Sequence, residues 1–192
     1  MNYNDIYNAA SKRGNEFAEW IKRQCYSGRF IPEIIRQKDF KQNHLHHPEG
    51  NVFEHTMAAL KDYKGSNPII NLSILFHDVG KPDSAIIAED GNYYKFYNHD
   101  KIGVDVFNNI SRRMKFPKDV SEIISFVIEN HMRFHKIYEM KTKKIKSLIN
   151  SPYWNILSKV AYHDDHCRGK NKFSFEEYKQ NYMKAKKYKE RK

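Results

Sequence analysis

The adjacent residues His77 and Asp78 come directly after an almost uninterrupted apolar stretch, residues 69–76, which reads IINLSILF. A stretch of this composition belongs in a protein core, so the pair that follows it enters a region that excludes water. Burying an unpaired polar group costs about 2–7 kcal/mol, and burying an unpaired charge costs more. A hydrogen bond between the imidazole and the carboxylate would remove this cost, and so would a metal ion held between them. The pair alone leaves both arrangements open.

The pattern of the chain predicts a mostly α fold with one small β-hairpin. Segments 84–88 and 93–97 are rich in β-prone residues and flank an Asp90-Gly91 pair, which is a strong hairpin signal. Elsewhere apolar residues recur at the helical period. The predicted helices cover residues 4–26 (whole or broken at Gly14), 32–38, 51–63, a segment from Pro68, 99–114, 117–133, 142–150, 152–168 and 174–190.

Length and charge narrow the class of protein. A chain of 192 residues without a repeat or a long linker predicts one domain over residues 1–192. The net charge of +11 favours polyanionic partners such as nucleotides or nucleic acid. The two cysteines form no CxxC pair, and no segment reads as a signal peptide or a membrane span. These features predict a reduced, cytoplasmic protein.

Four further polar residues lie in phase with apolar residues on predicted helices: His55, His99, His131 and Asp164. One polar residue on a core face is usually a hydrogen-bonded core residue. Together with His77 and Asp78, however, six such residues from five helices point inward, and five independent core hydrogen bonds are a poor explanation for that. Asp165 lies about 100° around its helix from Asp164 and is predicted to face solvent.

Imidazole and carboxylate ligands without a thiolate suit Mn, Fe, Co, Ni, Zn or Mg and do not suit a structural zinc site rich in cysteine. If His55, His77, Asp78 and Asp164 bind one octahedral ion, two positions remain open. A water molecule and a phosphate oxygen can fill them, which is the arrangement that hydrolysis requires.

The series His55, His77-Asp78 and Asp164 resembles the H…HD…D signature of the HD-domain metal-dependent phosphohydrolases. The similarity is closest to the HD domain of bacterial CCA-adding enzymes and poly(A) polymerase-like nucleotidyltransferases. It runs over residues 46–169, leaving 1–45 and 170–192 as helical extensions. It is carried by the strings HHPEGNVFEHT (46–56), LFHDVGKP (75–82) and FYNHD (96–100).

The resemblance implies an HD-domain helical fold, one or two divalent metal ions, and phosphodiesterase or phosphatase activity on nucleotides or on RNA 2′,3′-cyclic ends. His99 and His131 match, in order, the two histidines that hold a second metal in part of the family. The chain differs in two ways. It lacks the nucleotidyltransferase head, and Asn98 stands where relatives usually have glycine before the histidine.

The resemblance also implies roles beside the ligands. Asp78 would bridge two metals or orient the attacking water, and Lys81 would bind the substrate phosphate and act in catalysis. Lys81 as a solvated turn residue is the alternative. Arg133, His135 and Arg168 follow the proposed ligands closely and are candidates for binding phosphate.

Two other functions compete with hydrolysis. The first is a nucleotide- or RNA-binding module that kept the fold with little turnover, which the basic charge allows. The second is a diiron oxygenase, which some HD-fold proteins are. His46 and His47 precede the helix of His55 and either line the mouth of the cleft or lie on the surface. The sequence predicts no oligomeric state.

Overall fold

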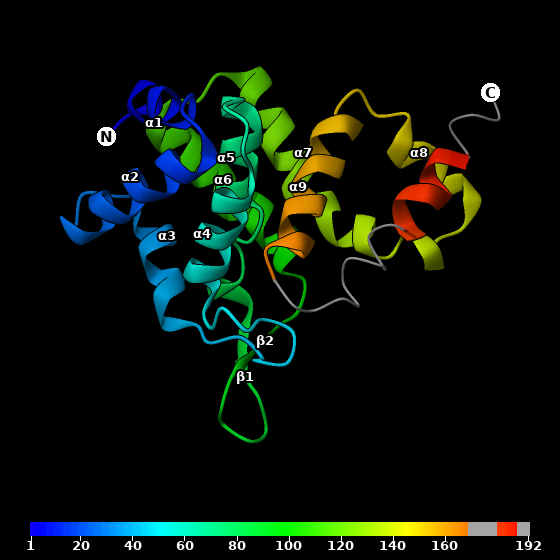
Figure 1. Ribbon diagram of the computed structural model, residues 1–192, viewed down its shortest axis with the longest axis horizontal. Coiled ribbons are helices and arrows are strands. Elements are labelled where there is room, and N and C mark those ends of the chain that lie inside the picture. Colours follow the sequence, from blue (N-terminus) through cyan, green and yellow to red (C-terminus); the bar gives the residue numbers. More distant parts are fainter. Residues whose placement is uncertain (169–179, 188–192) are drawn as a thin grey trace.

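The computed structural model describes residues 1–168 and 180–187, which form a helical body with one short hairpin extending from it (Figure 1). The first half contains α1 (Tyr3–Ala10), α2 (Gly14–Tyr26), α3 (Pro32–Ile35), the 3-10 turn η1 (Arg36–Asp39), α4 (Val52–Asp62), α5 (Pro68–Phe76), η2 (Pro82–Ser84), β1 (Ala85–Ile87) and β2 (Tyr94–Phe96). The second half contains α6 (His99–Met114), α7 (Lys118–His135), η3 (Ile137–Glu139), α8 (Thr142–Ile149) and α9 (Trp154–His166). Residues 180–187 are also helical.

The mostly α architecture with one hairpin is confirmed. The two strands pair antiparallel, with Ala85 opposite Phe96 and Ile87 opposite Tyr94. The first predicted helix is two helices, and the second begins at Gly14. A Cβ atom at Gly14 would lie 2.2 Å from the carbonyl oxygen of Leu60, so glycine lets α2 start against the end of α4. The predicted helix 174–190 falls mostly outside the described residues.

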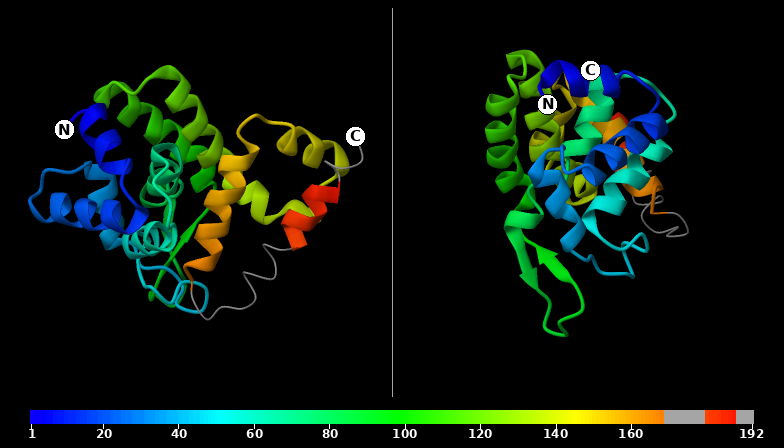
Figure 2. Two further views of the ribbon diagram at one scale, coloured as in Figure 1. Left: turned by 45° about the horizontal axis from the view of Figure 1, so that its top comes forward. Right: turned by 90° about the vertical axis from the view of Figure 1, so that its left-hand side faces the viewer.

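Helix α5 lies at the centre of the body and contacts α1, α4, α7 and α9 (Figure 2). Residues 70–76 of α5 are all buried, which fits a helix that is apolar on nearly every side. The His77-Asp78 pair follows at its C-terminal end and therefore lies inside the body. None of the described helices combines the length and the apolar character that crossing a membrane requires.

The turn after Asp78 brings the start of α6 against the end of α5. A Cβ atom at Gly80 would lie 2.2 Å from the carbonyl oxygen of His99 and 2.4 Å from the backbone nitrogen of Gly103. Only a residue without a side chain permits this approach. The two glycines thus place His99, the first residue of α6, beside the His77-Asp78 pair.

Candidate metal centre

The structure brings all six predicted ligand residues together from five helical segments. Their ligand atoms fall into two groups, each with its atoms within 4.8 Å of one another: His55, His77 and Asp164 in one, and Asp78, His99 and His131 in the other. All six residues are buried. Asp78 joins the groups, since its Oδ2 lies 3.2 Å from His77 Nε2 while its Oδ1 lies 3.5 Å from His99 Nε2.

Backbone carbonyls fix the orientation of three of these histidines. Each imidazole pairs through Nδ1 with the carbonyl oxygen three residues earlier, at 2.7 Å for His77, 2.9 Å for His99 and 2.7 Å for His131. A carbonyl oxygen only accepts hydrogen bonds, so Nδ1 carries the proton and Nε2 keeps its lone pair. Histidines that bind metals are commonly held in this way by their second nitrogen.

The Nε2 atoms of these histidines point toward one another, but they do not satisfy one another's hydrogen-bonding capacity. Within the described part of the chain, the buried His55 Nε2 and His77 Nε2 have no hydrogen-bond partner, although His55 Nε2 lies 2.9 Å from Asp164 Oδ1. His99 Nε2 and His131 Nε2 face each other at 3.2 Å, and each carries a lone pair. Burial, and then the neighbouring His99, lower the pKa of His131 well below its usual range. Inward imidazole nitrogens beside two carboxylates suit divalent cations.

His55 is held from behind by Glu49, a residue that the sequence analysis did not select. Glu49 Oε1 accepts from His55 Nδ1 at 2.5 Å and lies 3.0 Å from His47 Nδ1. Burial alone would raise the pKa of Glu49, but the hydrogen bonds from the two histidines outweigh it and lower that pKa. Glu49 thereby directs Nε2 of His55 toward Asp164. Glu49 lies in the loop before α4, where no helical period indicates this role.

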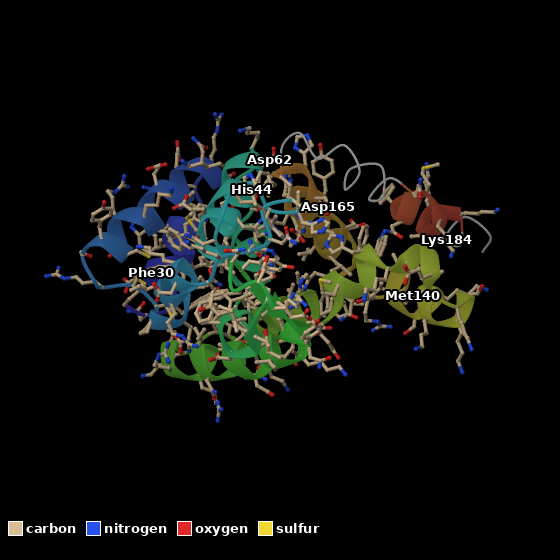
Figure 3. All side chains as sticks on the ribbon, turned by 90° about the horizontal axis from the view of Figure 1, so that it is seen from below. Phe30, His44, Asp62, Met140, Asp165 and Lys184 are labelled. Carbon is tan, nitrogen blue, oxygen red and sulfur yellow. The ribbon has the colours of Figure 1, made fainter. Side chains whose placement is uncertain are left out.

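The expectation that Asp165 faces solvent is wrong. Asp165 is buried, and its Oδ2 lies 3.1 Å from His135 Nδ1, while His135 Nε2 donates to Asp164 Oδ2 at 2.8 Å. Burial would lower the pKa of His135, but Asp165 and Asp164 outweigh it and raise this pKa to about 10. The predicted angle of about 100° between Asp164 and Asp165 around the helix is consistent with the structure. The Asp165 side chain, however, points to His135 at the end of α7 and not to solvent. Figure 3 shows Asp165 near the middle of the molecule.

A cavity of about 400 Å³ opens over the ligand groups. Lys81, one of its lining residues, is buried, so the solvated alternative is wrong; its Nζ lies 2.7 Å from Asp78 Oδ2. His135 and Arg168 line the same cavity, and Arg168 donates to Asp164 Oδ1 at 2.6 Å. His46, which is exposed, and His47, which is half-buried, also line it.

Arg133 is not brought to this cavity. Arg133 is not among the described residues that line the cavity, and its guanidinium donates to Asn130 Oδ1 at 2.6 Å. Two residues after His131 on α7, it lies about 200° around the helix, on the face away from the ligands. His135 lies one full turn after His131 and therefore does reach the cavity.

Asn98 accounts for the missing glycine before His99. Its backbone has φ 56° and ψ 25°, in the left-handed region that glycine favours. Asparagine enters this region more readily than other residues with a side chain. The substitution therefore preserves the turn into α6 and the placement of His99.

Comparison with known proteins agrees with this geometry. The HD domain family matches residues 51–186, and the chain belongs to that family. Its relatives include the Multifunctional CCA protein of Halorhodospira halophila, 29% identical over 135 residues that cover 68% of this chain and 31% of the relative. The Multifunctional CCA protein of Haemophilus influenzae is 29% identical over 113 residues, covering 55% and 26%. The chain thus matches less than a third of the length of these relatives, over the HD region.

Proposed function

We propose that this protein is a metal-dependent phosphohydrolase, a phosphodiesterase or phosphatase that acts on a nucleotide or on the phosphoester at the end of an RNA. The proposed ligands are His55, His77, Asp78 and Asp164, with His99 and His131 for a second ion, and the metal is Mn, Fe, Co, Ni, Zn or Mg. One observation carries the proposal: buried imidazole nitrogens that have no hydrogen-bond partner among the described residues point at two carboxylates beneath a cavity. The relatives are named Multifunctional CCA proteins, and the resemblance to CCA-adding enzymes supports RNA or a nucleotide as the substrate class.

A bound divalent ion would supply Lewis acidity toward the phosphoryl group and make a water molecule acidic enough to attack it. Asp78 has the position of a bridge, because its two oxygens face different ligand groups: Oδ1 lies 3.7 Å from His131 Nε2, and Oδ2 lies 3.7 Å from His55 Nε2. Glu49 and the backbone carbonyls keep the imidazoles aimed. These residues set the geometry before substrate arrives.

Three cationic side chains line the cavity and are proposed to bind the substrate phosphate: Lys81, His135 and Arg168. The carboxylates of Asp78 and Asp164 hold them in place, so little reorganisation is needed when negative charge grows on the phosphoryl oxygens. Such fixed electrostatic stabilisation is often the largest single contribution to catalysis. Arg133 is not needed for this arrangement.

The test is a panel of phosphomonoesters, phosphodiesters and 2′,3′-cyclic nucleotides, each assayed with the purified chain and Mn²⁺, Ni²⁺, Co²⁺ or Mg²⁺. The proposal expects metal-dependent release of phosphate or opening of the cyclic ester, and none with the His77→Ala variant. If the metal-loaded protein binds nucleotides but hydrolyses nothing in the panel, the binding-module alternative replaces the proposal. Oxygen consumption with Fe²⁺ would instead identify an oxygenase.

A further inference from the structure

Gln42 is a buried polar residue beside the cavity and is not one of the proposed metal or phosphate ligands. It lies in the segment before α4, which backbone hydrogen bonds fix on two sides. Gln42 N donates to Gly50 O at 2.8 Å, and Tyr94 N of β2 donates to Lys41 O at 2.9 Å. Gln42 is 5% exposed and lines the cavity. Its position is therefore set by the fold and does not depend on a flexible loop.

The orientation of the Gln42 amide follows from its contact with Lys81. Lys81 Nζ donates to Gln42 Oε1 at 2.7 Å, and an ammonium group has no acceptor, so the oxygen must be the atom that faces Lys81. Gln42 Nε2 then points elsewhere, and it has no hydrogen-bond partner among the residues that the structure describes. A buried N–H donor without a partner, on a residue that lines a cavity, is suited to a ligand that brings an acceptor.

An aromatic surface stands next to this donor. Tyr94 and Phe96 alternate along β2 and so share one face of the strand. Lys81 Nζ lies 5.6 Å from the centre of the Phe96 ring, so this face is turned toward the site. Phe40 packs against Tyr94 with the ring centres 5.1 Å apart and supports it from the side. Both strand residues are half-buried and line the cavity.

We propose that Gln42, Tyr94 and Phe96 form a subsite for the nucleoside part of the substrate, beside the position of the phosphate. The planar base lies against the aromatic face, and Gln42 Nε2 donates to an oxygen of the nucleoside. Base stacking on aromatic side chains is a common and strong contribution to nucleotide binding. The cavity of about 400 Å³ falls in the range of small-ligand sites. This inference rests on the proposed function, because that function places the phosphate at Lys81.

Binding to the Mn²⁺-loaded protein tests the subsite without turnover. The probes are the phosphonate analogues of adenosine 5′-monophosphate and ribose 5-phosphate, in which a methylene group replaces the ester oxygen. Isothermal titration calorimetry is expected to show the adenosine analogue bound about 10-fold more tightly than the ribose analogue. In Tyr94→Leu this preference should disappear while binding of the ribose analogue stays unchanged. Tyr97→Leu is the matched control, since Tyr97 follows β2 but is 60% exposed.

Two substitutions at Gln42 separate its N–H donor from its contact with Lys81. Gln42→Glu keeps an oxygen for Lys81 and loses the donor but adds a negative charge, whereas Gln42→Met loses both contacts and adds no charge. We expect both variants to bind the adenosine analogue more weakly than the wild type does. If Gln42→Glu binds it as the wild type does, the donor role is wrong. Circular dichroism checks that each variant is folded.

The outcomes distinguish the subsite from the proposed function. If the wild type binds the two analogues equally, or if Tyr94→Leu behaves as Tyr97→Leu does, the subsite is wrong even if the protein hydrolyses phosphoesters. If the preference for adenosine is present but nothing is hydrolysed, the subsite stands and the proposed function fails. A short RNA with a 2′,3′-cyclic end, compared with 2′,3′-cyclic AMP, shows which source supplies the nucleoside. An equal loss of binding affinity for the RNA and for 2′,3′-cyclic AMP in Tyr94→Leu supports one subsite that both ligands share.

Discussion

Helices α4 and α9 bring histidine and carboxylate side chains together at two places. In the interior, within the inner cluster formed by the six proposed ligands, His55 of α4 meets Asp164 of α9, with Nε2 and Oδ1 2.9 Å apart. Near the surface, Asp62 at the end of α4 meets His163 and His166 of α9, whose Nδ1 atoms lie 2.6 and 2.8 Å from its two oxygens. The residue types are the same in both clusters. Their surroundings are not.

In the outer cluster each carboxylate oxygen has one imidazole partner within hydrogen-bond distance. His166 is half-exposed, and the Tyr63 ring packs against His163 with the centres 5.1 Å apart. In the inner cluster Glu49 takes Nδ1 of His55, so Nε2 is aimed at Asp164 and lies outside hydrogen-bond geometry. The comparison teaches that residue type does not identify a metal site. The feature that indicates a metal ligand is an imidazole that points one ring nitrogen into the interior while a hydrogen bond holds its other ring nitrogen.

The largest expected effect separates the two clusters directly. His77→Ala or Asp78→Ala should abolish hydrolysis while the fold largely survives, because either change removes a proposed ligand. Activity with the best substrate and metal of the panel measures the effect, and circular dichroism checks the fold. Near wild-type turnover in either variant would show that the inner cluster does not take part in catalysis.

The next prediction concerns the role of two histidines within the inner cluster. If His99 and His131 hold a second ion, His99→Ala or His131→Ala should lower bound metal from about two ions per chain toward one. If they contact only the substrate phosphate, the metal content should not change and substrate affinity should fall. Metal analysis beside a KM measurement distinguishes the two cases. We expect the first, since four other residues already suffice for one ion.

A smaller difference is expected between neighbouring residues of α9. Asp164→Asn should cost both activity and metal affinity, because this carboxylate faces His55. Asp165→Asn should leave metal content unchanged and lower activity by about 10–100-fold, since Asp165 faces His135 and Arg168, which line the cavity, and is not itself a proposed ligand. Equal metal loss in both variants would show that α9 presents Asp165 to the ion as well.

The smallest effect belongs to the outer cluster. Asp62→Asn should lower the free energy of unfolding by about 0.2–1 kcal/mol, as expected for a partly exposed contact between a carboxylate and imidazoles. Metal content and kcat/KM should stay at wild-type values. Urea denaturation measures the stability. A loss of bound metal in this variant would contradict the distinction between the clusters.

Helical periodicity predicted much of this arrangement. The apolar neighbours of His55, His131 and Asp164 placed each of them on the inner face of its helix, and the structure brings them together. Periodicity works here because the direction of a side chain on a regular helix follows from its position in the sequence.

The same reasoning failed where no period exists or where direction alone was known. Glu49 and Gln42 lie in the loop before α4, so nothing local predicts that they face His55 and Lys81. For Asp165 the angle was right, but the sequence did not show that His135 of α7 lies in that direction. Such contacts depend on how helices distant in the sequence pack together.

The most direct test of the account is the metal content of the purified chain after it is loaded with Mn²⁺ and dialysed. Inductively coupled plasma mass spectrometry should find one or two ions per chain in the wild type and in Asp62→Asn. His55→Ala should retain substantially less, because it removes the nitrogen that Glu49 aims at Asp164. If His55→Ala keeps the full metal content, or if Asp62→Asn loses it, the ion is not bound where this account places it.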